Sequence, residues 1–140
     1  MSLNHSLRKR AWLASLVVLY LALPAQGQTA MSASDFDAYA TGKTLTYSLS
    51  DQVWGTEQYL PGRRVIWAFQ GETCEYGAWH VEADAICFTY ENRPEPQCWQ
   101  FFITDHGLSA HFVGDIGGSP LSELAQTNVP MSCPGPDLGV

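Results

Sequence analysis

Basic residues are scarce in this sequence of 140 residues. Seven Lys and Arg stand against fourteen Asp and Glu, and three of the seven lie together at positions 8–10. Without that stretch, four basic residues remain against fourteen acidic ones, a net charge of −10. Binding to phosphates needs clustered Lys and Arg, so this balance argues against nucleic acid or an anionic membrane surface as partner. The length leaves room for one ordinary globular domain and excludes a two-domain enzyme.

Apolar runs are also missing, except near the N-terminus. Residues 1–27 combine the basic stretch 8–10, an apolar run of 13 residues from Ala11 to Leu23, and small residues at Ala25 and Gly27, the two positions that a signal peptidase reads. A membrane-spanning helix needs about 20 apolar residues. The pattern therefore predicts a bacterial Sec-type signal peptide over 1–27, cleaved to leave a single domain over 28–140. The mature protein is expected in the periplasm or outside the cell, without membrane attachment.

The four cysteines lack the paired spacing of a metal or redox site. They lie at Cys74, Cys87, Cys98 and Cys133, with separations of 13, 11 and 35 residues. A zinc site would want ligands two to four residues apart, and no Cys-x-x-Cys pair is present. An even number of cysteines in an exported chain predicts two disulfides. Three connectivities are open, and a meander favours Cys74 with Cys98 and Cys87 with Cys133.

Helix patterns are confined to two short segments. Ser34 followed by Asp37, with Gly42 beyond, predicts a short N-terminal helix of about two turns with Ser34 as its N-cap. Ser119-Pro120 predicts a second short helix through Gln126, because proline suits the first helical position.

Between these segments the chain has short β-branched and aromatic runs at intervals of about ten residues, which is typical of an antiparallel all-β meander. We predict a small barrel or sandwich of about seven strands, with Glu91–Gln97 as a loop because of its two prolines. The expected strands are 44–48, 53–59, 64–70, 78–82, 85–91, 98–104 and 108–113. Alternation places one core on the inward residues Val65, Trp67, Phe69, Ile86, Phe88, Tyr90, Trp99, Phe101, Ile103, Leu108, Ala110 and Phe112.

Several short motifs resemble those of small secreted alphaproteobacterial proteins of unknown function, including the domain of unknown function DUF995. The motifs are Thr41–Thr44, Glu57–Arg64, Gly77–Trp79, Ile86–Phe88 and Cys98-Trp99. The resemblance implies export and a β fold, and it implies no catalytic residue. Thr41-Gly42 before a strand also resembles the opening glycine of lipocalin-like barrels, with Thr44 where those barrels place a tryptophan; this is an analogy of fold alone.

Two clusters of titratable residues could carry chemistry. Asp105, His106 and His111 lie on a hairpin turn and the strand after it, where two imidazoles and a carboxylate could bind one metal ion. The alternative is that Asp105 and His106 form the turn while His111 faces solvent.

His80, Glu82 and Asp84 form the second cluster. As neighbours on one strand face, His80 and Glu82 could act as a base with its orienting acid or as metal ligands. The alternative is a polar outward face, and nothing nearby supplies a nucleophile or third ligand.

Arg63 and Arg64 are the only adjacent basic residues after position 27. Together with Tyr59, a guanidinium pair could bind a carboxylate, a phosphate or an acidic loop of a partner. Intramolecular pairing with the many carboxylates is the alternative. Trp54 lies in the most polar run and is the tryptophan most expected to be exposed as a binding residue.

These observations favour an exported, non-enzymatic binding or interaction module, acting on a protein or small molecule and holding no cofactor. Catalytic residues are not assigned, because no nucleophile or phosphate-binding motif is present. The alternatives are a metal-dependent hydrolytic enzyme that uses Asp105, His106 and His111, a lipocalin-like small-ligand carrier, and an envelope inhibitor that uses Arg63 and Arg64.

Overall fold

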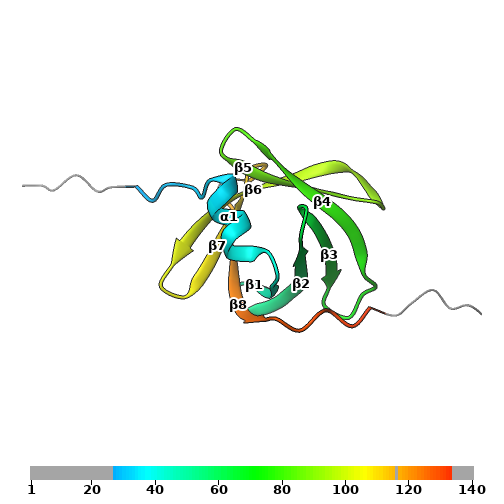
Figure 1. Cartoon of the computed structure of the whole chain (residues 1–140). Coiled ribbons are helices and arrows are strands. Elements are labelled where there is room, and N and C mark those ends of the chain that lie inside the picture. Colours follow the sequence, from blue (N-terminus) through cyan, green and yellow to red (C-terminus); the bar gives the residue numbers. More distant parts are fainter. Residues whose placement is uncertain (1–26, 116, 134–140) are drawn as a thin grey trace, which may run out of the picture.

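The computed structural model describes residues 27–115 and 117–133 and shows eight antiparallel strands closed into a barrel (Figure 1). The strands follow one another around the barrel in chain order, and β8 returns to pair with β1. The all-β meander with an N-terminal helix and two disulfides is confirmed, as a barrel rather than a sandwich. The elements are α1 Ala33–Ala40, β1 Thr44–Leu49, β2 Gln52–Leu60, β3 Arg64–Phe69, β4 Glu75–Glu82, β5 Ala85–Tyr90, β6 Arg93–Thr104, β7 Gly107–Phe112 and β8 Leu121–Thr127.

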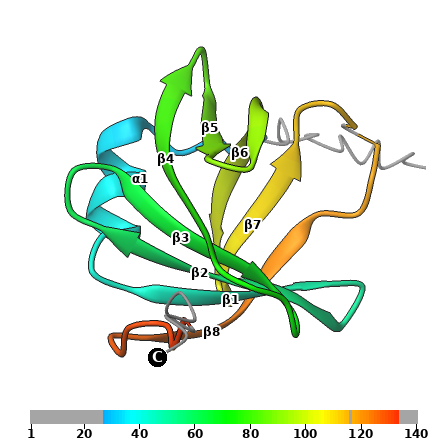
Figure 2. The ribbon, with the colours of Figure 1, turned by 90° about the vertical axis from the view of Figure 1, so that its right-hand side faces the viewer.

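Helix α1 covers one end of the barrel. Figure 1 looks toward that end, and Figure 2 shows from the side that the β1–β2 turn lies at the opposite end. The helix begins two residues earlier than predicted, because the N-cap is Ser32, whose Oγ accepts a hydrogen bond from the backbone N–H of Asp35 at 3.2 Å. Among the described residues, no helix is long and apolar enough to span a membrane. The predicted signal peptide, apart from Gly27, lies outside the described residues.

The second predicted helix, 119–126, is wrong: this segment forms strand β8. Its residues pair with β1 from Leu49↔Leu121 to Thr44↔Thr127, which closes the barrel. The free energy gained by pairing with β1 outweighs the local preference of residues such as Glu123 and Leu124 for a helix. Pairing with β7 is limited to Ser109 and Ala110, so β1 supplies most of the partners of β8.

The predicted loop at Glu91–Gln97 is also wrong, because β6 begins at Arg93 and runs through both prolines. β6 pairs with β5 at Arg93 and Gln97, with a register shift between these pairs, while its pairing with β7 starts only at Trp99. Residues 93–97 therefore form an edge on one side, where a residue without an N–H is tolerated.

The disulfides join Cys74 to Cys133 and Cys87 to Cys98, so the predicted pairing is wrong. Cys87 and Cys98 lie directly opposite each other on β5 and β6. Cys133 reaches the start of β4 because the chain after β8 runs back across the outside of β1 and β2. Its path is fixed by hydrogen bonds from Thr44 Oγ1 to the carbonyl of Val129 and from Met131 N–H to Gln58 Oε1. The two disulfides suggest an oxidising environment outside the cytoplasm.

The inward faces form a packed core in one half of the barrel only. Phe88 and Phe101 are buried as predicted, with 3% of each exposed. By contrast, Phe112 is 38% exposed and Trp99 is partly exposed, because they line open space at the other end. Ile103 is 51% exposed, a correction to the predicted core, since it lies near the hairpin turn, beyond the part of β7 that β8 covers.

Candidate ligand-binding cavity

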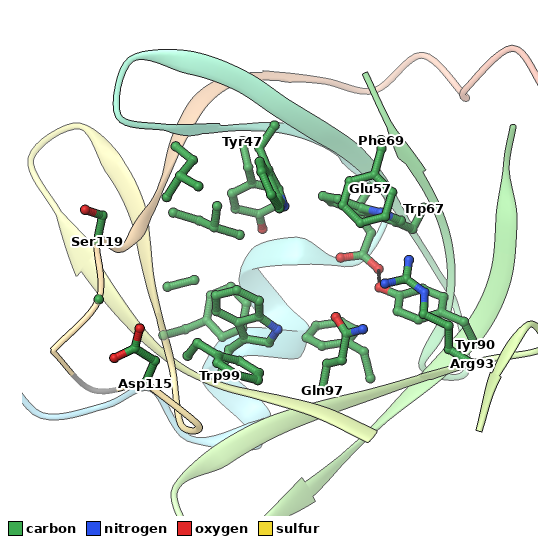
Figure 3. A pocket seen from close by; sticks show the side chains of 18 of the residues that line it. Tyr47, Glu57, Trp67, Phe69, Tyr90, Arg93, Gln97, Trp99, Asp115 and Ser119 are labelled. Atoms are coloured by element: carbon green, nitrogen blue, oxygen red, sulfur yellow. Dashed lines mark hydrogen bonds between the residues drawn. The ribbon is translucent and has the colours of Figure 1, made fainter. Parts of the chain in front are cut away.

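A cavity of about 640 Å³ occupies the half of the barrel opposite α1 (Figure 3). Its walls carry inward side chains from most of the strands, and Figure 3 shows them surrounding an open centre with α1 behind it. The aromatic walls comprise Trp67, Phe69, Phe88, Trp99, Phe101 and Phe112. The mouth is formed by residues of the β1–β2 turn, the start of β2 and the β7–β8 connection: Ser50, Trp54, Asp115, Gly118 and Ser119.

The end of the cavity nearest α1, its floor, is formed by Tyr59, Phe88 and Phe101, which pack against Phe36 of α1. This side chain is fully buried, and its ring packs edge-on against Tyr59, Trp79 and Phe88 at centroid distances of 5.6, 5.3 and 6.3 Å. The ring of Phe101 lies 4.5 Å away. Since Tyr59, Phe88 and Phe101 also line the cavity, Phe36 holds the floor residues from below.

Two glycines shape the walls. A Cβ on Gly55 would lie 2.4 Å from the Trp67 ring, and a Cβ on Gly77 would lie 2.8 Å from the Tyr90 ring. Both rings therefore lie directly over the glycine backbone of the neighbouring strand. This close approach lets Tyr90, on β5, reach a partner on β2.

That partner is Glu57, a carboxylate with only 4% of its surface exposed. Glu57 Oε1 accepts a hydrogen bond from Tyr90 Oη at 2.7 Å, and Oε2 accepts one from Tyr59 Oη at 3.0 Å. Tyr59 Oη is in turn 2.8 Å from Tyr47 Oη. A carboxylate and three tyrosine hydroxyls thus form one connected polar network in the cavity wall. Figure 3 shows Tyr47, Glu57 and Tyr90 of this network.

Burial raises the pKa of Glu57 to about 7, because a carboxylate loses hydration inside the barrel. The hydrogen bonds from Tyr90 and Tyr59 oppose this effect by stabilising the charged form. Burial and the nearby Glu57 charge raise the pKa of Tyr47, Tyr59 and Tyr90, so the three hydroxyls stay protonated at physiological pH.

Arg93 lines the same cavity but is paired with another carboxylate. Its Nε lies 3.1 Å from Glu75 Oε2, and its Nη2 contacts the same oxygen. The guanidinium also lies over the rings of Phe69 and Tyr90, at 4.9 and 5.4 Å from their centroids. The charge of Arg93 is therefore neutralised by Glu75, and its guanidinium packs against aromatic rings at the edge of the cavity.

The raised pKa of Glu57 predicts an unusual dependence of stability on pH. The native protein holds this proton more tightly than the unfolded chain, so the stabilising contribution is complete below about pH 4.5 and is lost as pH rises through about 7. Between pH 4.5 and 8, the free energy of unfolding of the wild-type protein should fall by about 3 kcal/mol more than that of Glu57→Gln. Urea denaturation of both proteins at intervals from pH 4.5 to 8 measures this, and parallel profiles would contradict it.

The predicted binding residues divide between the inside and the outside of the barrel. Tyr59 points inward and Trp54 lies at the mouth, 40% exposed, with its ring edge-on to Phe69 at 5.6 Å. Arg63 lies over the Trp79 ring at 4.5 Å, and Arg64 donates to the carbonyl of Pro61; neither lines the cavity. The structure therefore does not bring Tyr59 and the arginine pair into one site.

The residues of the predicted metal site are not brought together. Asp105 and His106 form the exposed β6–β7 turn, where the His106 N–H donates to Thr104 Oγ1. His111 lies on β7, with Nε2 3.2 Å from Ser109 Oγ.

The other titratable cluster lies on the outer face of the barrel. His80 Nε2 is 2.9 Å from Glu82 Oε1, and Asp84 accepts a hydrogen bond from Gln100. Cys87 lies within 4.8 Å of this pair, but its sulfur is bonded to Cys98 and cannot act as a thiolate ligand. In the described part of the chain this is the one group with metal-ligand spacing.

No protein-family model, no curated protein and no solved structure matches this chain. The roles of the cavity residues are therefore argued from their geometry and not from similarity to a known protein. Glu57 was not predicted as a site residue, although one signal was present in the sequence. Glu57 shares the inward face of β2 with Gly55 and Tyr59, and a lone carboxylate on an inward face is unexpected in a packed core.

Proposed function

We propose that this protein is an exported carrier that holds one small, largely apolar ligand inside the barrel. The observation that carries the proposal is the aromatic-walled cavity of about 640 Å³. Binding sites for small molecules commonly have volumes of about 300–1,000 Å³ and apolar walls with a few polar groups. An eight-stranded barrel is just wide enough either to be filled by its own side chains or to hold one small ligand, as lipocalins do.

Unfilled apolar walls support a ligand rather than a purely structural barrel. A packed interior leaves few voids larger than a water molecule, whereas this barrel leaves Phe69, Trp99 and Phe112 incompletely covered. A ligand that removed these surfaces from water would gain roughly 25 cal/mol for each Å² of apolar area. Export to the periplasm or beyond is part of the proposal, supported by the N-terminal pattern and the two disulfides.

The test uses the neutral fluorescent probe N-phenyl-1-naphthylamine on the chain without residues 1–27. Trp67 and Trp99 line the cavity, so a bound probe should quench tryptophan emission by energy transfer, with saturation at one probe per protein. Ala110→Phe should weaken binding about tenfold or more, because Ala110 is an inward residue of the cavity wall and the added ring would occupy the cavity.

Ala125→Phe is the matched control. Ala125 lies on β8, exposed on the outside of the barrel, so the same substitution there should leave probe binding unchanged. Absence of saturable binding, or equal binding by both variants, would contradict the carrier proposal.

A further inference from the structure

We infer that the ligand of this cavity is an organic amine cation, whose ammonium group hydrogen-bonds to the Glu57 network while its apolar body lies among the aromatic walls. This inference rests on the proposed carrier function and deepens it by naming the ligand class. It depends on three features of the site: which hydrogen-bonding groups are left free, which charges are left unpaired, and what surrounds them.

The hydrogen-bonding atoms that the Glu57 network leaves free are all acceptors, although Gln97, which also lines the cavity, carries an amide donor. Each tyrosine has a single hydroxyl proton, and those of Tyr59 and Tyr90 are donated to Glu57. Tyr59 has no second proton, so in its contact with Tyr47 it must accept, and Tyr47 donates. All three protons are therefore directed along the network toward the carboxylate, and only oxygen lone pairs remain for a ligand. A ligand that complements these atoms must supply N–H or O–H donors.

The charge of Glu57 is also left without a partner. Among the described residues, no Lys or Arg forms an ion pair with it. Arg93 is paired with Glu75, while Lys43 and Arg63 lie over aromatic rings elsewhere. A buried carboxylate without a counterion is costly, and an entering cation removes that cost. A neutral donor such as an alcohol would supply a hydrogen bond but no charge.

The surroundings favour a cation as well. The faces of tryptophan and phenylalanine rings attract ammonium groups, by about 2 kcal/mol or more when the pair is shielded from water. Asp115 lies at the mouth, and the residues after position 27 carry a net charge of −10, which attracts cations from solution. A carboxylate ligand would instead meet the like charge of Glu57, with the nearby guanidinium of Arg93 already bound by Glu75.

Binding of a cation should also displace the proton of Glu57. The raised pKa of about 7 leaves this group partly protonated near neutral pH in the empty protein, and an ammonium group favours the ionised form. The pKa values of the three neighbouring tyrosines are raised, so their hydroxyls keep their protons in this range, and β3 presents no titratable side chain to the network. The groups that face Glu57 are Tyr47 from β1, Tyr59 from β2, Tyr90 from β5, and Arg93 from β6 with its partner Glu75 from β4.

The experiment compares three compounds with the same apolar body by isothermal titration calorimetry: 2-(1-naphthyl)ethylamine, 2-(1-naphthyl)ethanol and 1-naphthaleneacetate. At pH 7.5 the amine should bind about tenfold or more tighter than the alcohol, and the carboxylate should bind most weakly. Amine affinity should fall by up to about tenfold per pH unit below pH 7, while alcohol affinity stays nearly flat. In Glu57→Gln the preference for the amine and its pH dependence should both disappear.

A second measurement needs no variant and so does not depend on Glu57→Gln folding. Titration of the wild-type protein at pH 6, in buffers of different ionisation enthalpy, should show release of about one proton per amine bound and none per alcohol bound. Equal or tighter binding of the alcohol or carboxylate, absence of proton release, or an amine preference that survives in folded Glu57→Gln would overturn the inference. If N-phenyl-1-naphthylamine still binds in those cases, the carrier proposal stands; if none of the compounds binds, both proposals fail.

Discussion

Replacing Phe36 with alanine is expected to lower the free energy of unfolding by about 3–5 kcal/mol, a large part of the stability of a domain of this size. Phe36 is fully buried, and four aromatic rings surround it. Ala40 is the only other buried residue of the short helix, although Tyr39 also packs against the core and donates a hydrogen bond to Glu123. The substitution therefore removes the largest fully buried side chain that attaches the helix to the barrel.

The loss should extend to the cavity. Since Tyr59, Phe88 and Phe101 rest on Phe36, its removal opens space beneath the floor and allows these rings to move. Weaker binding of N-phenyl-1-naphthylamine is expected together with the lower midpoint of urea denaturation. Phe102→Ala is the matched control, because Phe102 is a partly exposed phenylalanine outside the core cluster and should cost much less. Similar losses of stability and probe binding in both variants would show that Phe36 has no special role at the end of the barrel that α1 covers.

Strand alternation was enough to predict most of the barrel. Runs such as Val65, Trp67 and Phe69 have one inward face whatever the strand pairs with, because side-chain direction has a period of two residues. The end of the meander could not be predicted in this way. Whether 121–127 forms a helix or a strand depends on the free edge of β1, about 75 residues earlier, and local sequence carries no record of that partner.

The cavity could not be predicted for a related reason. Alternation tells which side chains face inward, but not whether chains from opposite walls meet. Here the rings of Trp67 and Tyr90 pack against the backbone of Gly55 and Gly77 on the neighbouring strands, and the centre of the barrel stays open. The polar network has the same character, since Tyr47, Glu57 and Tyr90 come from three strands and meet only once the barrel closes.

Removing the disulfide between Cys74 and Cys133 is expected to cost more stability than removing the other one. In the loop-closure model, a link across 59 residues stabilises by about 4 kcal/mol and a link across 11 residues by about 3 kcal/mol. The positions of the two disulfides in the native structure should make this difference in stability larger. Cys87 and Cys98 join strands that are already paired to each other, whereas Cys133 anchors the segment after β8 to the start of β4.

The comparison uses two double-alanine variants, Cys74→Ala with Cys133→Ala and Cys87→Ala with Cys98→Ala, each leaving the other disulfide intact. Urea denaturation should give the larger loss for the first variant, and limited proteolysis should cleave it near Val129, whose contact with Thr44 depends on the anchored segment. The second variant should keep that segment protected. A larger loss in the second variant would mean that the β5–β6 hairpin, rather than the closure of the chain across β1 and β2, limits the stability of the barrel.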